Sequence, residues 1–586
     1  MQPTQRFNQL KSILTSGLKY GEISHRHERI TKAFASTFEW IFQQPDREGT
    51  TATWANFREW LEEGKGIYWI TGKPGSGKST LMKFIHDNLL TDSCLRVWAQ
   101  EKPFLRGRFY FWNSGAPIQM SIEGLYKALA YEVLSELEDE SCIRFLCPER
   151  WEIASLFEQA DPEPWKAAEC ESILRKLTDG RLSNHRIFFL IDGLDEFSGD
   201  QKLLLDFIQH LGQVPHIKVC CASRPWVEFQ DAFHQAPSLR VQQLTGPDIK
   251  HYISTKFGSH PSMNGWRACY PNAIESIAED INERSSGVFL WVVLVVQSLL
   301  SGVSSGDRIS DLQARLNELP PDLDKLFSKI LKSMSQRYQS HASQIFQIHS
   351  ASNADINLIT LSFADDIDHI RLVSNKPIHY RRGNRENRCE MMYRRLASRT
   401  KGLLEAGPQT SGSESPKVQY LHRTVRDYFS IPQVWNNIVS MVDATFNPHF
   451  ALVAAFCAFL KTREPWYLLD QSDDQSRFIL DQLTSSLVKC RPENHAVLVP
   501  VLDALDQFIS LAPMGRPDRK ASLCARFLPI GVLLGLGFWV KPTLQRDLAS
   551  TNTASLWACF GEVLNWHSRY KIRCIGTVRM LLEFAL

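Results

Sequence analysis

Long hydrophobic stretches are missing from this sequence. No apolar run reaches the ~18 residues that a membrane-spanning helix needs. The two longest candidates are residues 288–296 and 528–540, and the second contains Pro529 and three glycines. Both are more typical of buried helices. The first six residues carry no apolar signal core. We therefore expect no membrane span and no secretory leader, and a cytoplasmic protein.

An excess of charge of one sign is also missing. The 586 residues contain 66 Lys and Arg against 64 Asp and Glu, a formal net charge of +2. No global field therefore attracts nucleic acid or a membrane surface. Basic pairs occur at Arg381–Arg382 and Arg394–Arg395, but without the interleaved aromatic residues of a nucleic-acid groove. We expect these pairs to be solvated and expect no nucleic-acid partner.

Several catalytic and metal-binding patterns are absent as well. The 13 cysteines include no C-x-x-C pair, and no Cys and His spacing is typical of zinc. Reduced thiols in a cytosolic setting are the simplest interpretation. No G-x-S-x-G marks a hydrolase nucleophile. With an apolar fraction of 44% and a charged fraction of 22%, the chain is nevertheless ordinary globular protein.

One pattern is complete: a phosphate loop of the form G-x-x-x-x-G-K-S at residues 72–79. An apolar run at residues 67–70 precedes it, and residues 80–85 have helical character, so the loop has the strand and helix that its mechanism requires. Glycines allow the backbone to approach an anion, and the loop N–H groups bind phosphate. Lys78 is expected at the β- and γ-phosphates and the Ser79 hydroxyl on Mg²⁺. The predicted nucleotide-binding residues are Gly72, Lys73, Pro74, Gly75, Ser76, Gly77, Lys78, Ser79 and Thr80.

A second pattern, made of acidic residues, follows a fully apolar strand at residues 187–191. Asp192 ends that strand. In phosphate-loop NTPases, the carboxylate that holds Mg²⁺ has the same position at a strand end. We therefore assign Ser79 and Asp192 to a Mg²⁺ site. Asp195 and Glu196 lie within one turn and could polarise an attacking water as catalytic groups. The alternative is that these carboxylates only cap the next helix.

Arg224 follows another predicted strand, residues 217–223. Because ligands of parallel α/β sheets bind beyond the carboxyl ends of the strands, Ser79, Asp192 and Arg224 are expected to converge on one nucleotide. A guanidinium there could bond the γ-phosphate or report its absence. The alternative is a surface ion pair.

The order of predicted elements indicates an α/β phosphate-loop NTPase followed by mostly helical domains. Strands alternate with helices up to about residue 246, which favours a parallel sheet with helices on both faces. Residues 27–42 and 274–300 are predicted helical, and residues 239–244 are a fifth candidate strand. No repeat of fixed period appears in the last 151 residues. We expect a helical lead at 1–60, a nucleotide-binding domain at 61–257 and helical segments at 258–335, 336–435 and 436–586.

Three stretches together resemble the NACHT class of STAND nucleotide-binding proteins, most closely the fungal relatives of NOD-like receptors. They are Trp69–Lys83, Leu190–Phe197 and Ala222–Trp226. A small residue after the strand-ending Asp, here Gly193, followed by further acids is a feature of this class. Gly287–Trp291 is similar to the helical-domain motif of the class, and Leu421–Tyr428 to its segment beyond the NTPase module.

The resemblance implies a sheet in which another strand separates the strands of the phosphate loop and of Asp192. It implies a winged-helix arrangement within 336–435, where His422 would contact the β-phosphate of ADP. From composition alone, His422 is an ordinary packed residue. The resemblance also implies an ADP-bound resting form, an ATP-bound form that self-associates, and a role in innate immunity or heterokaryon incompatibility. Effector and sensor repeats, usual in such receptors, are not visible here.

Taken together, the sequence predicts an intracellular signalling switch that binds ATP or GTP with Mg²⁺ and hydrolyses it weakly. One alternative is a turnover ATPase or phosphotransferase that uses the same loop. Another is a scaffold that holds nucleotide without hydrolysis. No motif decides between adenine and guanine, or indicates a protein partner.

Overall fold

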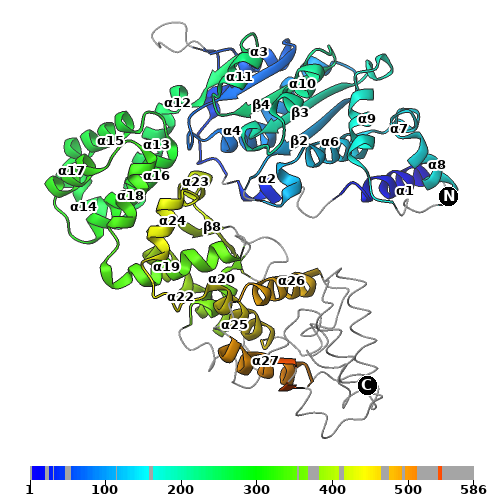
Figure 1. Ribbon diagram of the computed structural model, residues 1–586. Helices are drawn as coiled ribbons and strands as arrows, with labels where there is room; N and C mark the ends of the chain where they lie inside the picture. The colour runs from blue at the N-terminus through cyan, green and yellow to red at the C-terminus, as the bar shows by residue number, and fades with distance from the viewer. Residues whose placement is uncertain are drawn as a thin grey trace. The chain divides into compact units, whose positions relative to one another are not determined.

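The structure is a computed structural model of the chain (Figure 1). It describes residues 3–19, 25–30, 32–45, 54–113, 115–157, 163–352, 356–366, 382–407, 415–462, 474–490, 495–510, 539–540 and 542–543. These fall into two compact units, 1–326 and 327–586. No helix among the described residues is both long and apolar enough to cross a bilayer. The ten cysteines described are all free thiols.

A five-stranded parallel sheet forms the centre of the first unit, with the strand order β2-β3-β4-β1-β5. The strands are β1 Gly66–Thr71, β2 Phe104–Tyr110, β3 Arg186–Asp192, β4 Ile217–Ser223 and β5 Ser238–Arg240. Strand β4 lies between β1, which leads into the phosphate loop, and β3, which ends at Asp192. The expected α/β class and the intervening strand are therefore confirmed.

Helices cover both faces of this sheet because the strand residues that point to either face are apolar. On one face, Phe189, Ile191 and Val219 pack in a core with helices α1, α6, α7, α8, α9, α10 and α11. On the other, Phe188, Leu190 and Cys220 pack with α3, α4 and α5. The bounds are α1 Pro3–Ser16, α3 Phe57–Glu62, α4 Lys78–Asp87, α5 Leu89–Ala99, α6 Ile122–Glu136, α7 Glu140–Leu146, α8 Pro148–Phe157, α9 Ala167–Lys176, α10 Gln201–Gly212 and α11 Val227–Phe233.

The rest of the first unit is helical. It comprises α12 Val241–Leu244, α13 Gly246–Ser259, α14 Pro261–Cys269, α15 Pro271–Ser285, α16 Phe289–Ser304, α17 Ile309–Glu318 and the start of α18 Leu323–Lys332. The helical prediction for 274–300 is confirmed apart from a break at 286–288, which separates α15 from α16. Ser286 and Gly287, with φ of +46° and +74°, lie in the left-handed region and end α15.

Two further local expectations are corrected. Residues 27–42 are not one helix: α2 covers only His25–Arg29 and a 3₁₀ turn, η1, covers Glu39–Phe42. Phe38 has a φ of +66°, and its N–H donates to Asp248 (3.1 Å), so a tertiary contact replaced the helical bond. The apolar spacing there reflects burial and not a helix face. The fifth strand ends at Arg240 because residues 241–244 turn into α12.

The second unit combines helices with a small sheet of order β6-β8-β7. Its described elements run in the order α19 Gln336–Ala351, β6 Ile356–Asn357, α20 Leu358–Ala364, α22 Arg382–Thr400, β7 Leu404–Ala406, β8 Lys417–Tyr420, α23 Arg423–Phe429, α24 Pro432–Val439, α25 Pro448–Leu460, α26 Asp474–Val488 and α27 His495–Ser510. Helices followed by a β7-β8 hairpin that pairs with β6 give the winged-helix order implied by the resemblance.

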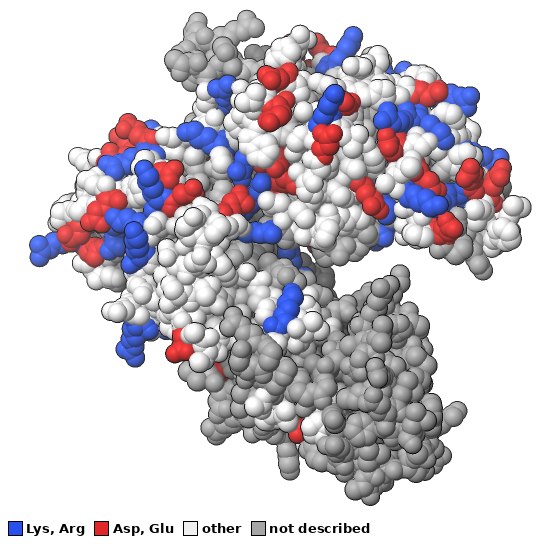
Figure 2. Space-filling view, viewed as in Figure 1, with Lys and Arg blue, Asp and Glu red and all other residues white. Residues whose placement is uncertain are grey.

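Parts of the sequence predictions lie outside the described residues. These are most of the polar loop at 407–416, most of the apolar run at 528–540 and most of the chain beyond 510. Side chains of both kinds of charge intermingle on the visible face of the first unit, with no surface of one sign (Figure 2). This distribution agrees with the balanced charge of the sequence.

Candidate nucleotide site

The phosphate loop joins β1 to α4 at the carboxyl edge of the sheet. Gly75 and Gly77 have φ values of +73° and +97°, which L side chains rarely adopt. The N–H of Ser76 donates to the Lys73 carbonyl (3.2 Å), which closes the turn. These positive-φ glycines leave the loop backbone open to a close ligand, as the motif predicts.

Lys78 lies across its own loop. Its Nζ donates to the carbonyl oxygens of Gly72 (2.7 Å) and Lys73 (3.0 Å). The ammonium is therefore held beside the loop N–H groups, where phosphate oxygens would displace carbonyls as its acceptors. Two buried hydroxyls nearby, Thr71 Oγ1 and Ser76 Oγ, have no hydrogen-bond partner among the described residues. Buried hydroxyls without a hydrogen-bond partner are consistent with a polar ligand that binds in the loop.

The expected metal ligands lie together. Ser79 hydrogen-bonds Asp192, whose side chain is only 2% exposed at the end of β3. Burial raises the pKa of the Asp192 carboxyl to about 6, the Ser79 bond and Arg26 lower it, and Glu196 and Asp195 raise it. A divalent cation would favour the ionised form, and a hydroxyl beside a carboxylate is an oxygen donor set that suits Mg²⁺. The residues present therefore fit this ion.

Asp195 and Arg224 form one ion pair at the ends of β3 and β4. Asp195 lies in η4 (Leu194–Glu196), which begins at Gly193 with a φ of +73°. Its Oδ1 accepts from the Arg224 backbone N–H (3.1 Å), and its Oδ2 lies 3.1 Å from Arg224 Nε. Asp195 is 6% exposed. The pair therefore positions the guanidinium at the carboxyl edge, and it is not a surface ion pair.

Glu196 has a different environment. It is 7% exposed, and its Oε2 accepts from the Asn113 backbone N–H (3.0 Å). The alternative that Asp195 and Glu196 cap the next helix is wrong, because Asp200 caps α10 by accepting from the Lys202 N–H (3.0 Å). Glu196 therefore contacts the segment that follows β2.

Three residues that the sequence analysis did not assign contact the phosphate loop. Gln242 accepts from the Lys73 N–H (3.1 Å), and the Leu290 N–H donates to the Gly75 carbonyl (3.0 Å). A Cβ on Gly77 would lie 3.2 Å from the Phe38 ring. Gln242 follows the end of β5 by two positions, so the strand-end rule that indicated Arg224 could have indicated it. Phe38 gave no such signal.

His422 lies in the second unit and caps α23. Its Nδ1 accepts from the Thr424 N–H (3.1 Å), so it is the N-cap residue of that helix. This contact explains a polar residue here without a nucleotide. A role in ADP binding stays a prediction.

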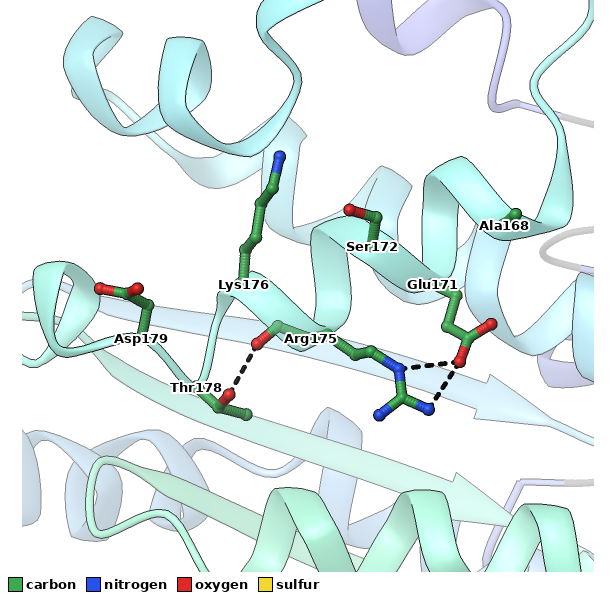
Figure 3. Close-up of a pocket in the computed structure, with 7 residues that line it drawn as sticks. All are labelled: Ala168, Glu171, Ser172, Arg175, Lys176, Thr178 and Asp179. Atoms are coloured by element: carbon green, nitrogen blue, oxygen red, sulfur yellow. Dashed lines mark hydrogen bonds and ion pairs between the residues drawn. The ribbon is translucent and has the colours of Figure 1, made fainter.

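A surface hollow of the first unit lies away from the phosphate loop. It has a volume of about 500 Å³ and follows the outer side of α9 (Figure 3), lined by Ala168, Glu171, Ser172, Arg175, Lys176, Thr178 and Asp179. Helix α9 leads into the start of β3, so the hollow lies toward the amino edge of the sheet. Arg175 and Glu171 pair across it (2.7 Å). It therefore does not belong to the nucleotide site.

Comparison with known proteins agrees with this geometry. Residues 36–224 match the family described as Nephrocystin 3, N-terminal, and residues 333–468 match a domain of unknown function (DUF7791). The chain is similar to the vegetative incompatibility protein HET-E-1 of Podospora anserina, at 24% identity over 315 residues. That alignment covers 52% of this chain and only 22% of the relative.

Solved structures show weaker likenesses. A STAND protein with a tetratricopeptide repeat sensor from Pyrococcus horikoshii has 12% identity and a TM-score of 0.29, covering 94% of this chain and 72% of that one. A Drosophila ORC structure bound to DNA has 11% identity and a TM-score of 0.29, covering 73% of this chain and 99% of that one. Both TM-scores are too low to indicate a shared overall fold.

The phosphate loop, the acidic strand end and the arginine strand end fall within residues 36–224, which match the family described as Nephrocystin 3, N-terminal. They occupy neighbouring strands of one sheet, in the order that the NACHT resemblance implies. The match over residues 36–224 and the similarity to HET-E-1 therefore support a nucleotide-binding module of the NACHT/STAND NTPase type found in fungal NOD-like receptors.

Proposed function

We propose that this protein is a nucleotide-dependent switch that binds ATP or GTP with Mg²⁺, hydrolyses it slowly and changes conformation to signal or to self-associate. Lys78 and the loop N–H groups hold the phosphates, and Ser79 and Asp192 hold the metal. Arg224 reads the γ-phosphate from its pair with Asp195. Asp195 or Glu196 orients the attacking water.

The observation that carries this proposal is the bond between the phosphate loop and the helical part of the first unit. The Leu290 N–H at the start of α16 donates to the Gly75 carbonyl inside the loop. A Cβ on Gly75 would lie 2.9 Å from Leu290 Cβ, so the two segments are in close contact. A loop that rearranges around phosphate would therefore displace α16, which gives nucleotide state a mechanical output.

The rival functions predict different behaviour. A phosphotransferase would pass the γ-phosphate to an acceptor bound beside it. A turnover ATPase would release ADP quickly, and a scaffold would not hydrolyse at all. Similarity to HET-E-1 favours a role in incompatibility signalling, and self-association of the ATP form is part of this proposal.

The test is to denature the purified protein and identify the nucleotide that it releases, alongside a steady-state hydrolysis assay. We expect close to one nucleoside diphosphate per chain and slow turnover. An empty site with fast turnover would favour the enzyme. Retained triphosphate that is never hydrolysed would favour the scaffold. The identity of the base answers the choice between ATP and GTP.

A further inference from the structure

Two histidines and an aspartate meet where the N-terminal segment crosses the far end of α4. His27 belongs to α2, and His86 and Asp87 are the last two residues of α4. Their ligand atoms all lie within 4.8 Å of one another. The nucleotide site uses none of these three residues, because it lies at the other end of α4, beginning at Lys78.

The distances within this cluster match those of a metal site. His27 Nε2 lies 3.1 Å and His86 Nδ1 2.9 Å from the same oxygen, Asp87 Oδ1. A tetrahedral zinc ion with bonds of about 2.0–2.1 Å separates its ligand atoms by about 3.3 Å. Small shifts of these side chains therefore create the site. We propose that His27, His86 and Asp87 bind a divalent transition-metal ion of the zinc class, which clamps α2 to the C-terminal end of α4.

Contacts with neighbouring side chains hold the ligands in place before an ion arrives. Lys83 Nζ donates to the His27 carbonyl, and the His27 ring packs against the rings of His86 and Tyr110 at centroid distances of 5.2 and 5.4 Å. The C-terminal end of a helix also carries partial negative charge, which favours a cation beside Asp87. The ordering cost of binding is therefore small.

Positively charged side chains face the cluster and limit its affinity for a metal ion. Arg108 Nη1 lies 3.2 Å from both ring nitrogens of His86, a position possible only over the ring face because Cε1 fills the plane between them. The Nδ1 lone pair, in the ring plane, is therefore not covered by this guanidinium. Arg108 also pairs with Glu132 (3.6 Å), Arg106 pairs with Asp92, and Lys83 is bound to its carbonyl, so each of these cations has another partner.

Ligand chemistry selects the ion. Two imidazoles and one carboxylate suit Zn²⁺ or Co²⁺, whereas Mg²⁺ prefers oxygen ligands. The Asp87 side chain is 44% exposed, which leaves room for water as a fourth ligand.

The test titrates chelator-treated protein with Zn²⁺ in excess Mg²⁺, against a coloured zinc indicator, and records the visible spectrum with Co²⁺. We expect wild-type protein to bind one ion that His86→Gln and Asp87→Asn do not bind, with loss of the tetrahedral Co²⁺ absorption. His234→Gln, an exposed histidine outside the cluster, is the matched control and should behave as wild type. Equal stoichiometry in wild type and both cluster variants would overturn the proposal.

The loss of Zn²⁺ binding in the cluster variants could also come from misfolding, so a variant that should bind Zn²⁺ more tightly is needed. Arg108→Gln removes the cation over the His86 ring and should strengthen Zn²⁺ binding roughly tenfold. Misfolding could not produce this gain. Unchanged or weaker Zn²⁺ affinity in Arg108→Gln, with an unaltered circular dichroism spectrum, would also count against the site.

Discussion

Lys78 is the only side-chain cation of the phosphate loop held against the loop carbonyls. Hydrogen bonds to charged groups contribute roughly 1.5–3 kcal/mol each, so Lys78→Ala should weaken binding of a non-hydrolysable ATP analogue at least tenfold. The melting temperature should stay close to that of wild type. Calorimetry measures the affinity, with Lys202→Ala on the exposed side of α10 as the control. Unchanged affinity in Lys78→Ala would remove the phosphate-loop assignment.

Single variants of the two buried acids of η4, Asp195 and Glu196, should have different effects. Glu196→Gln removes the carboxylate that is bound by the Asn113 N–H, and we expect hydrolysis to fall roughly a hundredfold while nucleotide affinity is kept. Asp195→Asn weakens the pair that positions Arg224, so it should reduce the preference for triphosphate over diphosphate. Single-turnover hydrolysis and competition binding measure both effects. Wild-type hydrolysis in Glu196→Gln would contradict the role of Glu196, and an unchanged triphosphate preference in Asp195→Asn would contradict the role of Asp195.

Among the elements, helix α3 depends on a buried lysine from the sheet. Lys218 in β4 is 0% exposed, and its Nζ donates to the carbonyls of Trp60 (2.7 Å) and Leu61 (2.6 Å) at the end of α3. Burial, and to a lesser extent Arg186, lowers the pKa of Lys218 to about 7, from an ordinary value of about 10.4. The unfolded chain therefore binds more protons than the folded one between these values.

The free energy of unfolding should consequently rise as pH increases from about 7 toward 10, and fall as pH decreases through the folded pKa. Lys218→Met removes this group, so its stability should change less with pH across the same window. Urea unfolding at pH 7 and pH 9, in reducing buffer, measures the difference. Lys202→Met, an exposed lysine, should keep the wild-type dependence. Identical pH dependence in Lys218→Met and wild type would assign the effect to other groups.

The break between α15 and α16 depends on Gly287. A Cβ at this position would lie 1.9 Å from the Gln242 carbonyl oxygen, and φ is +74°. Gly287→Ala therefore combines a left-handed penalty of about 1–2 kcal/mol with a backbone clash, and we expect a loss of about 3 kcal/mol or more. Gly306→Ala is a matched control, because φ there is +88° but nothing lies within 4 Å of the added Cβ. That variant should lose only about 1–2 kcal/mol.

Denaturant unfolding of both glycine variants compares the two costs. If Gly287→Ala is no less stable than Gly306→Ala, the chain can move α16 away from Gln242 easily. That outcome would also weaken the proposed link from the phosphate loop through Leu290 to α16.

For the whole molecule, His422 tests whether the protein is a switch. If its imidazole contacts the β-phosphate only in the resting form, losing that bond removes roughly 1–3 kcal/mol and shifts the resting population about five- to a hundredfold. Alanine would also remove the cap of α23. His422→Asn keeps a good N-cap while losing the imidazole, so it is the sharper variant. We expect it to self-associate and to lose ADP.

Light scattering with and without added ADP measures that shift. Lys78→Ala should not reproduce it, because that change weakens ATP as well as ADP. If His422→Asn stays monomeric and retains its nucleotide, His422 is only a helix cap, and the resting form is held by other residues.

The sequence by itself determined the nucleotide-binding module. A phosphate loop works through backbone N–H groups of consecutive residues, so its glycines, Lys78 and Ser79 are readable as one short pattern. A fully apolar strand that ends in Asp192, and a second strand followed by Arg224, indicated a parallel sheet buried on both faces. The rule that ligands bind at strand ends brought these groups together. The order of the strands came from resemblance and not from periodicity.

Only the tertiary structure decided which distant residues complete the site. Gln242 and Leu290 bond the loop across more than 160 positions of sequence, and no local pattern encodes such a contact. Apolar spacing over 27–42 indicated burial correctly but not conformation, because Asp248 holds the Phe38 N–H outside a helix. His27 meets His86 and Asp87 only because α2 crosses the end of α4. Burial and long-range hydrogen bonds set these features, and both depend on the folded chain.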